Sequence, residues 1–280
     1  MIPTLETRII SNFILCIDHV IQQAGKAYTN YSSQFFPMGS DLAGYYAYGA
    51  PFKPMCNDVS VSGANVLSGL YLNGLFNPIG SGHFKAFNHY KGMAYFDQPL
   101  AGSIQISGNY AIKDFSIALS DQPEWKLLFD TKYVSNNEYN QILSGLDPET
   151  KICPIIYVLV KGQQNEPFGI THIDNAQLNI RCVVISDTEY QSLGACSILK
   201  NMYQQFLPML KNQPFDTMGN ITGSNYNYKT QVLDSQYPVW ISKAKSIDIS
   251  QKGDYKDIRK NLALVDFSFS TIVQNAQGLP

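Results

Sequence analysis

The sequence is poor in charged residues. They make up 15% of its 280 residues, and the net charge is −2 at pH 7, whereas about a quarter of the residues are charged in an average globular protein. No cluster of Lys and Arg is present, so we do not expect binding to nucleic-acid phosphates to be its main role. Asn, Gln, Ser and Tyr replace the missing charges, a composition that suits lasting contact with other proteins.

The sequence also lacks the short motifs that mark common catalytic sites. It contains no GxxxxGK[ST] phosphate loop, no HExxH zinc motif and no GxSxG nucleophile elbow. Gly80 and Gly82 lack the third glycine and the strand–turn–helix context of a dinucleotide-binding fingerprint. We therefore expect no enzymatic activity, no cofactor and no metal site.

A few residues could still carry chemistry, although a structural role is the simpler interpretation for each. His83 and His89 lie in a predicted hairpin and could form a metal pair, but ordinary surface histidines are favoured. Cys182 and His172 could act as nucleophile and base, yet a thiol in the middle of a buried strand is inert. Paired carboxylates could serve glycoside hydrolysis, but the aspartates of the middle region are better explained as turn residues and strand ends (Asp58, Asp97, Asp114, Asp121 and Asp130).

Cysteine usage and hydropathy exclude two further classes. The chain has five cysteines and no CxxC pair, and Cys16, Cys182 and Cys196 lie among apolar residues. This pattern favours buried free thiols over a disulfide framework. No apolar run approaches the roughly 20 residues that span a bilayer, so we expect no membrane association.

The best-defined local pattern runs from residue 178 to residue 210. The segment LNIRCVVISD has β-branched residues at its centre, which predicts a buried strand. Asp187 and Thr188 then offer side-chain oxygens as helix caps, and apolar residues recur at three- and four-residue steps as far as Leu210. The pattern predicts a strand and a long amphipathic helix, which together form half of an α/β layer.

A second amphipathic helix is predicted over residues 5–25, where apolar residues recur about every four positions and Gly25 ends the run. Asp18, His19 and other polar residues interrupt the apolar segment, so a core helix is favoured over a signal peptide. We expect this helix to pack beside the 188–210 helix on one sheet.

Residues 27–130 have a different character, with short alternating segments separated by turn residues. Asn73-Gly74 lies between two apolar arms, which is the strongest short-range signal for a hairpin. Lys91-Gly92 marks a second hairpin, and alternation continues over residues 103–121. Residues 124–134 are predicted as another strand. These features predict a β-rich block resembling a sandwich or barrel.

The first part of this block, residues 27–52, is rich in aromatic residues but has little regular period. We predict an extended arm or loop that covers another surface, because so many exposed aromatics would form an unusually large apolar patch. The candidate interface anchors are Tyr45, Tyr46, Tyr48 and Phe52. With Tyr71, these residues could instead form a sugar-stacking platform or simply belong to the core.

The remaining segments complete an α+β fold. A short helix is predicted from Asn136 to about Leu146, a buried strand over residues 153–162 and a polar connector over residues 163–177. Two half-buried antiparallel strands follow at 239–250 and 262–273. Residues 1–26 and 131–280 are thus predicted to form an α/β core with a mixed sheet and two long helices, into which the β-rich block 27–130 is inserted.

Several segments resemble virion structural proteins of tailed phages, in particular the neck or tail-completion group that includes the tail terminators. The similar segments are LETRIISNFILCIDHVI, YAYGAPFKPMCNDVSVSGA, LYLNG, ISGNYAIKDFSI, NIRCVVISDTEYQSL and LVDFSFS. The resemblance implies a non-enzymatic subunit of a sixfold homo-oligomeric ring that closes the tail tube and joins it to the head. It implies contact with other neck, tail tube or sheath proteins.

The same resemblance implies a location in the tail or neck of the virion, and in the host cytoplasm during assembly. The β-rich block is a departure, since compact tail terminators lack it. The alternative function is therefore a carbohydrate-binding or receptor-binding virion module built on that block.

Overall fold

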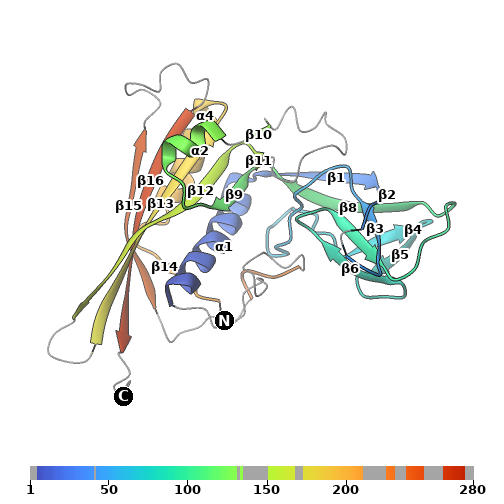
Figure 1. Cartoon of the computed structure of the whole chain (residues 1–280), viewed down its shortest axis with the longest axis horizontal. Helices are drawn as coiled ribbons and strands as arrows, with labels where there is room; N and C mark the ends of the chain where they lie inside the picture. The colour runs from blue at the N-terminus through green and yellow to red at the C-terminus, as the bar shows by residue number, and fades with distance from the viewer. Residues whose placement is uncertain are drawn as a thin grey trace.

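The computed structural model describes residues 5–40, 42–130, 133–134, 151–167, 173–210, 225–230, 238–248 and 261–274. The fold is mixed α+β and is built mainly from strands, which form several sheets. Helix α1 (Leu5–Gly25) lies between one long-stranded sheet and a second group of shorter strands (Figure 1). The helix predicted over residues 5–25 is confirmed.

The long-stranded sheet has six strands in the order β14-β15-β16-β13-β12-β9. Neighbouring strands are antiparallel except β12 and β9, which run parallel, so the sheet is mixed. The strands are β9 (Ser116–Leu119), β12 (Ile155–Pro167), β13 (Ile173–Ser186), β14 (Phe206–Leu207), β15 (Val239–Asp248) and β16 (Asn261–Gln274).

Both faces of this sheet are covered. On one face α1 and α4 (Glu189–Lys200) share an apolar cluster with the sheet, in which the fully buried Phe13 packs edge-on against Phe267 and Phe269, each at 4.9 Å between ring centroids. On the other face Leu127 of α2 (Glu124–Asp130) joins a second cluster of strand residues. Successive β13 residues therefore enter different clusters, and this is why its sequence is apolar without alternation.

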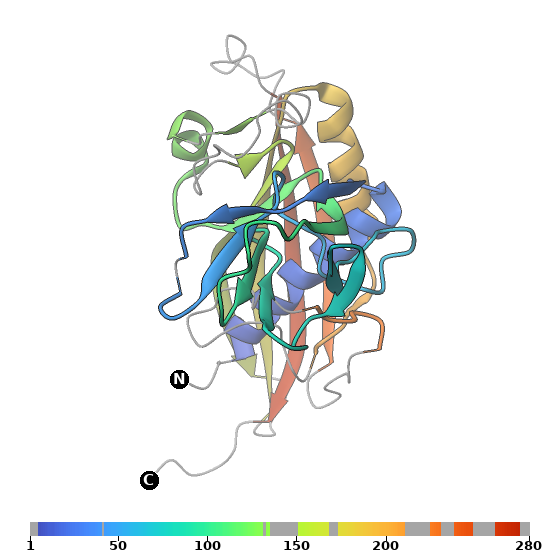
Figure 2. The same ribbon diagram turned by 90° about the vertical axis from the view of Figure 1, so that its right-hand side faces the viewer.

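The shorter strands form two four-stranded sheets, ordered β1-β8-β4-β5 and β2-β3-β7-β6, that share one apolar cluster. They lie in front of α1 and the long strands in Figure 2. The strands are β1 (Tyr28–Gln34), β2 (Phe36–Met38), β3 (Tyr46–Gly49), β4 (Gly69–Leu72), β5 (Leu75–Pro78), β6 (Phe84–Asn88), β7 (Met93–Phe96) and β8 (Ile106–Lys113). A separate parallel pair joins β10 (Tyr133–Val134) and β11 (Lys151–Ile152).

The hairpin predicted at Asn73-Gly74 is confirmed. Asn73 and Gly74 have φ angles of 49° and 83°, and they connect the antiparallel strands β4 and β5. Left-handed backbone at both turn positions matches the right-handed twist of the two strands, which is why Asn-Gly is favoured there. The hairpin around Lys91-Gly92 is confirmed in the same way, as β6 and β7.

The prediction that the second helix extends to Leu210 was wrong. Helix α4 ends at Lys200, the chain turns through Gln204 in the left-handed region at φ 56°, and Phe206–Leu207 pair with β15 as β14. Pro208 has no N–H group, and its ring would clash with the carbonyl group four residues earlier in a continued helix. The apolar residues beyond Lys200 recur at helical spacing, but they lie in a turn and a short strand.

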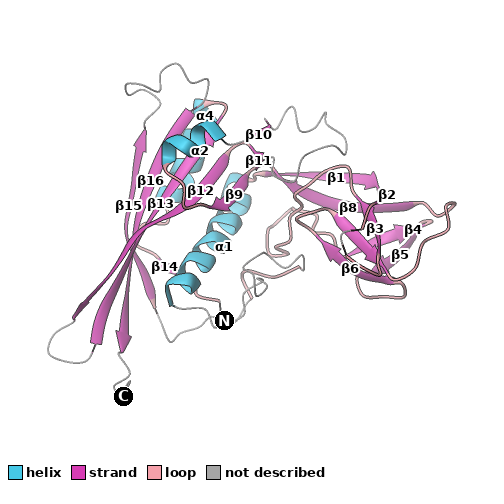
Figure 3. Cartoon of the chain, in the orientation of Figure 1, coloured by secondary structure: helices cyan, strands magenta, loops and turns pink. Residues whose placement is uncertain are grey.

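Two further segments differ from their predictions, as the colouring of Figure 3 shows. Residues 124–130 form helix α2 and not a strand, because the Pro123 carbonyl accepts hydrogen bonds from the N–H groups of Lys126 and Leu127 and starts a helical turn. The predicted polar connector at 163–177 consists largely of β12 and β13, which pair antiparallel as far as Pro167 and Asp174. The backbone N–H and C=O groups of the two strands are paired there, whatever the polarity of the side chains.

The arm predicted over residues 27–52 is largely strand, since it contains β1, β2 and β3; β1 pairs with β8, β2 with β3, and β3 with β7. Strand β9 pairs with β12, and α2 packs on the six-stranded sheet. The short helix predicted from Asn136 to Leu146 lies outside the described residues.

Candidate functional site

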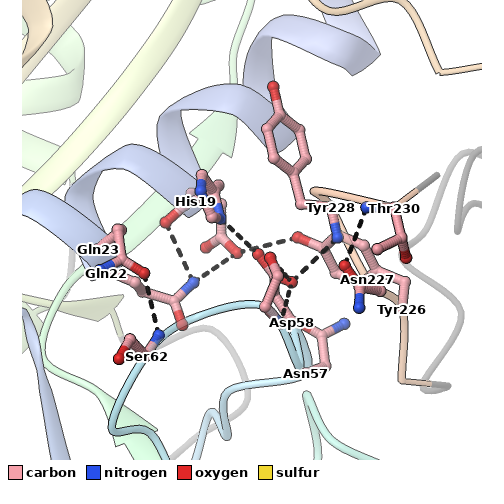
Figure 4. A network of polar contacts seen from close by, with 12 residues as sticks. His19, Gln22, Gln23, Asn57, Asp58, Ser62, Tyr226, Asn227, Tyr228 and Thr230 are labelled. Carbon is pink, nitrogen blue, oxygen red and sulfur yellow. Dashed lines mark hydrogen bonds and ion pairs between the residues drawn. The ribbon is translucent and has the colours of Figure 1, made fainter. Parts of the chain in front are cut away.

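Buried ionisable side chains gather where α1 meets the loop of residues 55–62, the end of β8 and the segment 225–230. Figure 4 shows part of this region. We call the region the α1 junction; its members are Asp18, His19, Gln22, Asn57, Asp58, Lys113, Tyr226 and Tyr228. Charged side chains are rarely buried unless they are paired. The hydrogen bonds of the α1 junction therefore decide what it can do.

An ion pair joins α1 to β8. The Lys113 ammonium group lies 2.8 Å from each carboxylate oxygen of Asp18, and both residues are less than 10% exposed. Gln22 Nε2 donates to the same carboxylate at 2.8 Å. The hydroxyl of Tyr226 reaches it from the 225–230 segment at 3.5 Å. The buried charge of Asp18 is thus compensated by a neighbour on α1 and by two elements that are distant in sequence.

A second pair joins α1 to the loop. His19 Nδ1 lies 2.6 Å from Asp58 Oδ2, and the His19 ring stacks on Tyr228 with centroids 4.5 Å apart. Asp58 also accepts hydrogen bonds from the Ser60 hydroxyl, the Ser60 N–H and the Tyr228 N–H. Burial disfavours the charged form of Asp58, but these hydrogen bonds outweigh burial and lower the pKa of its carboxyl group.

Backbone hydrogen bonds close the α1 junction. The Tyr226 N–H donates to the Asn57 carbonyl and the Val59 N–H donates to the Tyr226 carbonyl, both at 2.9 Å. Burial raises the pKa of the neighbouring Cys16 thiol to about 11, so this thiol is protonated and weakly nucleophilic at neutral pH. The geometry favours an architectural role, in which the paired charges fix the position of α1 against the β-rich part.

The four predicted interface anchors lie in different environments. Tyr48 is a core residue, with its ring 5.3 Å from that of Phe96 and its hydroxyl accepting from the Leu100 N–H at 3.0 Å. Phe52 is partly buried against Tyr31. Tyr45 is half-buried, whereas Tyr46 is 48% exposed and available for contact.

The other candidate residues have structural partners. His83 is exposed and pairs with Asp97 at 2.8 Å, while His89 is buried and lies 3.2 Å from the Leu67 carbonyl. Cys182 is fully buried, burial raises the pKa of its thiol, and all five cysteines are free. His172 lies outside the described residues. Within the described parts of the chain, no three His, Cys, Asp or Glu side chains are grouped to hold a metal ion.

The sequence did not identify the α1 junction as a site. A signal was present, because Asn12, Asp18, His19 and Gln22 are polar residues within an otherwise apolar helix, and all four are buried. Their partners at 57–58, 113 and 226–228 have no local pattern that connects them to α1. Only the folded chain brings these segments together.

A second ionic cluster lies on the opposite face of the sheet. Glu124 of α2 binds Lys161 at 2.6 Å and Arg181 at 3.1 Å, and Arg181 also forms two hydrogen bonds with Asp266. Burial opposes ionisation of Glu124, but the hydrogen bonds from Lys161, its own backbone N–H and Arg181 outweigh burial. Together they lower its pKa from 4.5 to about 2. The cluster attaches α2 to the sheet.

This shift predicts an acid-dependent contribution to stability. A carboxyl group whose pKa is lower in the folded state stabilises the fold above its unfolded pKa, and the contribution is lost as pH falls through the folded pKa. The stability advantage of the wild type over Glu124→Gln should therefore be largest above about pH 4.5 and should shrink toward about pH 2. Urea unfolding midpoints at several pH values measure this, with exposed Asp121→Asn as control. An advantage independent of pH contradicts the prediction.

No protein-family model matches the sequence, and no curated protein matches it significantly. None of the described helices is long and apolar enough to cross a bilayer.

Proposed function

We propose that the protein is a non-enzymatic structural subunit of an oligomeric ring in the neck or tail of a tailed phage, as a tail terminator or head–tail connector. Its partners in this role are further copies of the same chain and other neck, tail tube or sheath proteins. The resemblance of the sequence segments to the neck and tail-completion group is the origin of this proposal.

The observation that supports it most directly is the exposure of large apolar side chains on the β-rich part. Among the described residues these are Phe36, Met38, Leu42, Tyr46, Val59, Leu75, Phe76 and Tyr90, between 41% and 74% exposed. Apolar and aromatic side chains are enriched at interfaces, and large exposed apolar patches mark contact surfaces. The α1 junction also supports a non-enzymatic role, because its charges are buried and paired within the fold.

We further propose that the β-rich block is an inserted, barrel-like domain that docks onto neighbouring subunits. Two observations support this. Its two four-stranded sheets share one apolar cluster, and the clusters of the six-stranded sheet consist of other residues. A domain with its own core keeps its shape when it binds, which lowers the entropic cost of assembly.

The experiment that tests the function is a determination of oligomeric state and symmetry. Light scattering and electron-microscopy class averages of the purified protein, and of particles with the protein labelled, should show a ring, expected to be sixfold. A trimer that binds glycans favours the alternative of a carbohydrate-binding or receptor-binding module. A monomer in solution together with absence from particles excludes the ring.

Tyr46 is the predicted interface anchor most exposed for contact. Replacing it by Ala should weaken self-association by roughly 30-fold, because truncating an interface anchor costs about 2 kcal/mol and every 1.4 kcal/mol is tenfold. The melting temperature of the dissociated protein should not change. Sedimentation equilibrium measures the association, with Tyr190→Ala as control, since Tyr190 is 88% exposed on α4. Equal association of both variants would place the interface elsewhere. Tyr48→Ala is unsuitable because it empties a core position.

A further inference from the structure

Along part of each edge, the six-stranded sheet has no further partner strand among the described residues. Strand β9 pairs with β12 only over Ile155–Val158, and the Ser120 N–H then donates to the Val158 carbonyl. From Leu159 to Pro167, β12 pairs only with β13 within the described parts of the chain. A strand edge with free N–H and C=O groups is a template for a further strand.

The opposite edge is open over a similar length. Strand β14 pairs with β15 at Val239 and Trp240, and the backbone of Gln204 and Gln205 binds Ile241. From Ser242 to Asp248, β15 pairs only with β16 among the described residues. The two segments are thus of similar length, nine and seven residues, and each lies next to a β-bulge, at Val160/Gly162 in β12 and at Ile241/Lys243 in β15.

We propose that two copies of this chain join head to tail through these edges, with residues 161–167 of β12 in one copy pairing with residues 242–248 of β15 in the next. This inference rests on the proposed ring and names the contact that builds it. The contact is heterologous, because different surfaces of the two copies meet, and such contacts generate rings when the rotation closes.

Strand direction agrees with this contact. Strand β12 is antiparallel to β13, β13 to β16, and β16 to β15, so β12 and β15 run antiparallel within one sheet. Rotation about a ring axis along the strands preserves strand direction. The β12 edge of one copy then meets the β15 edge of the next in the antiparallel arrangement, which is slightly more stable than the parallel one.

The charges on the two edges are complementary. Glu166 is opposite Asn175, and Lys245 is opposite Asp266. Both therefore lie on the sheet face that carries the Arg181–Asp266 pair, and Lys243 lies on the same face next to Lys245. All three side chains are exposed. An antiparallel register with Glu166 opposite Lys243 also places Gln164 opposite Lys245, and both pairs then share that face.

Charge also explains why we expect the β15 edge to pair with a second copy of this chain. Lysines on an exposed edge discourage indiscriminate strand pairing, so the β15 edge selects a strand that carries a negative charge on the matching face. The β12 edge of the same protein carries Glu166 at that place. Selection by opposite charge and rejection of like charge together give specificity.

Charge reversal tests the contact. Glu166→Lys alone, and Lys243→Glu with Lys245→Glu, should each raise the dissociation concentration of the wild-type oligomer by at least about tenfold, because like charges then face each other across the strands. An equimolar mixture of the two proteins should assemble again as an alternating ring, since each junction regains opposite charges. Glu189→Lys, an exposed reversal on α4, is the matched control and should leave assembly unchanged.

A disulfide tests the register. Gln164→Cys with Lys245→Cys should form covalent oligomers on oxidation, because side chains directly opposite in an antiparallel pair have Cβ atoms about 4.5–5.5 Å apart. Gln164→Cys with Ser242→Cys is the off-register control. If the wild type is oligomeric but neither charge reversal nor oxidation has these effects, the edge contact is overturned and the ring proposal stands. If the wild type forms no ring in solution or in particles, both are overturned.

Discussion

Replacing Lys113 by Met is expected to lower the free energy of unfolding by about 3–5 kcal/mol, as is typical when one partner of a buried ion pair is removed. Asp18 is 6% exposed and would lose the ammonium group that lies 2.8 Å from both of its oxygens. The hydrogen bond from Gln22 and the contact with Tyr226 remain, but neither carries a positive charge. Urea unfolding of the dissociated protein measures the loss.

The control for this prediction is the double variant Asp18→Asn with Lys113→Met. It removes both charges, so it should be more stable than Lys113→Met alone, because a neutral pair needs no compensation. A Lys113→Met protein within about 1 kcal/mol of the wild type contradicts the prediction, since exposed pairs contribute no more than that. The α1 junction would then be accessible to solvent and its architectural role lost.

Phe13→Ala is expected to have an effect of the same size, about 3–5 kcal/mol, the usual cost of truncating a buried Phe. The Phe13 side chain is fully buried and contacts the rings of Phe267 and Phe269 at 4.9 Å each. Removing it leaves a cavity between α1 and β16 and removes the ring that contacts Phe267 and Phe269. Such a loss is a large part of the 5–15 kcal/mol that typically stabilises a domain.

The matched control for this prediction is Trp125→Ala on α2, because Trp125 is a larger aromatic residue that is 57% exposed. It should change stability far less than Phe13→Ala. Phe13→Leu separates volume from shape and should fall between the wild type and Phe13→Ala. Equal losses for Phe13→Ala and Trp125→Ala would indicate that α1 does not pack on β16 in solution.

Together the two predictions describe the role of α1. Phe13 attaches it to the six-stranded sheet, and Asp18 and His19, about one and a half turns further on, attach it to β8 and to the loop of the β-rich part. A subunit that transmits load between neighbours needs a fixed relation between its parts. Under the proposed function, variants of the α1 junction should therefore impair assembly as well as stability.

Local patterns in the sequence determined those elements whose conformation depends on nearby residues. Apolar spacing over residues 5–25 was sufficient for α1, because one face of that helix packs on apolar side chains along its length. Asn73-Gly74 alone was sufficient to predict the β4–β5 hairpin, because few other residue pairs accept left-handed backbone at both positions. The central apolar run was sufficient for β13, because the sheet is covered on both faces.

The tertiary structure alone decided the rest. Residues 163–167 and 173–177 are mostly polar, yet they are strands, because they pair with each other and residues 173–177 also pair with the distant β16. The chain after Lys200 keeps a helical apolar period, but pairing with β15 and Pro208 give it another conformation. The α1 junction joins residue 18 to residue 113 and residue 19 to residue 58. No local pattern encodes such a pairing, because a buried charge selects its partner by position in the folded protein and not by distance along the chain.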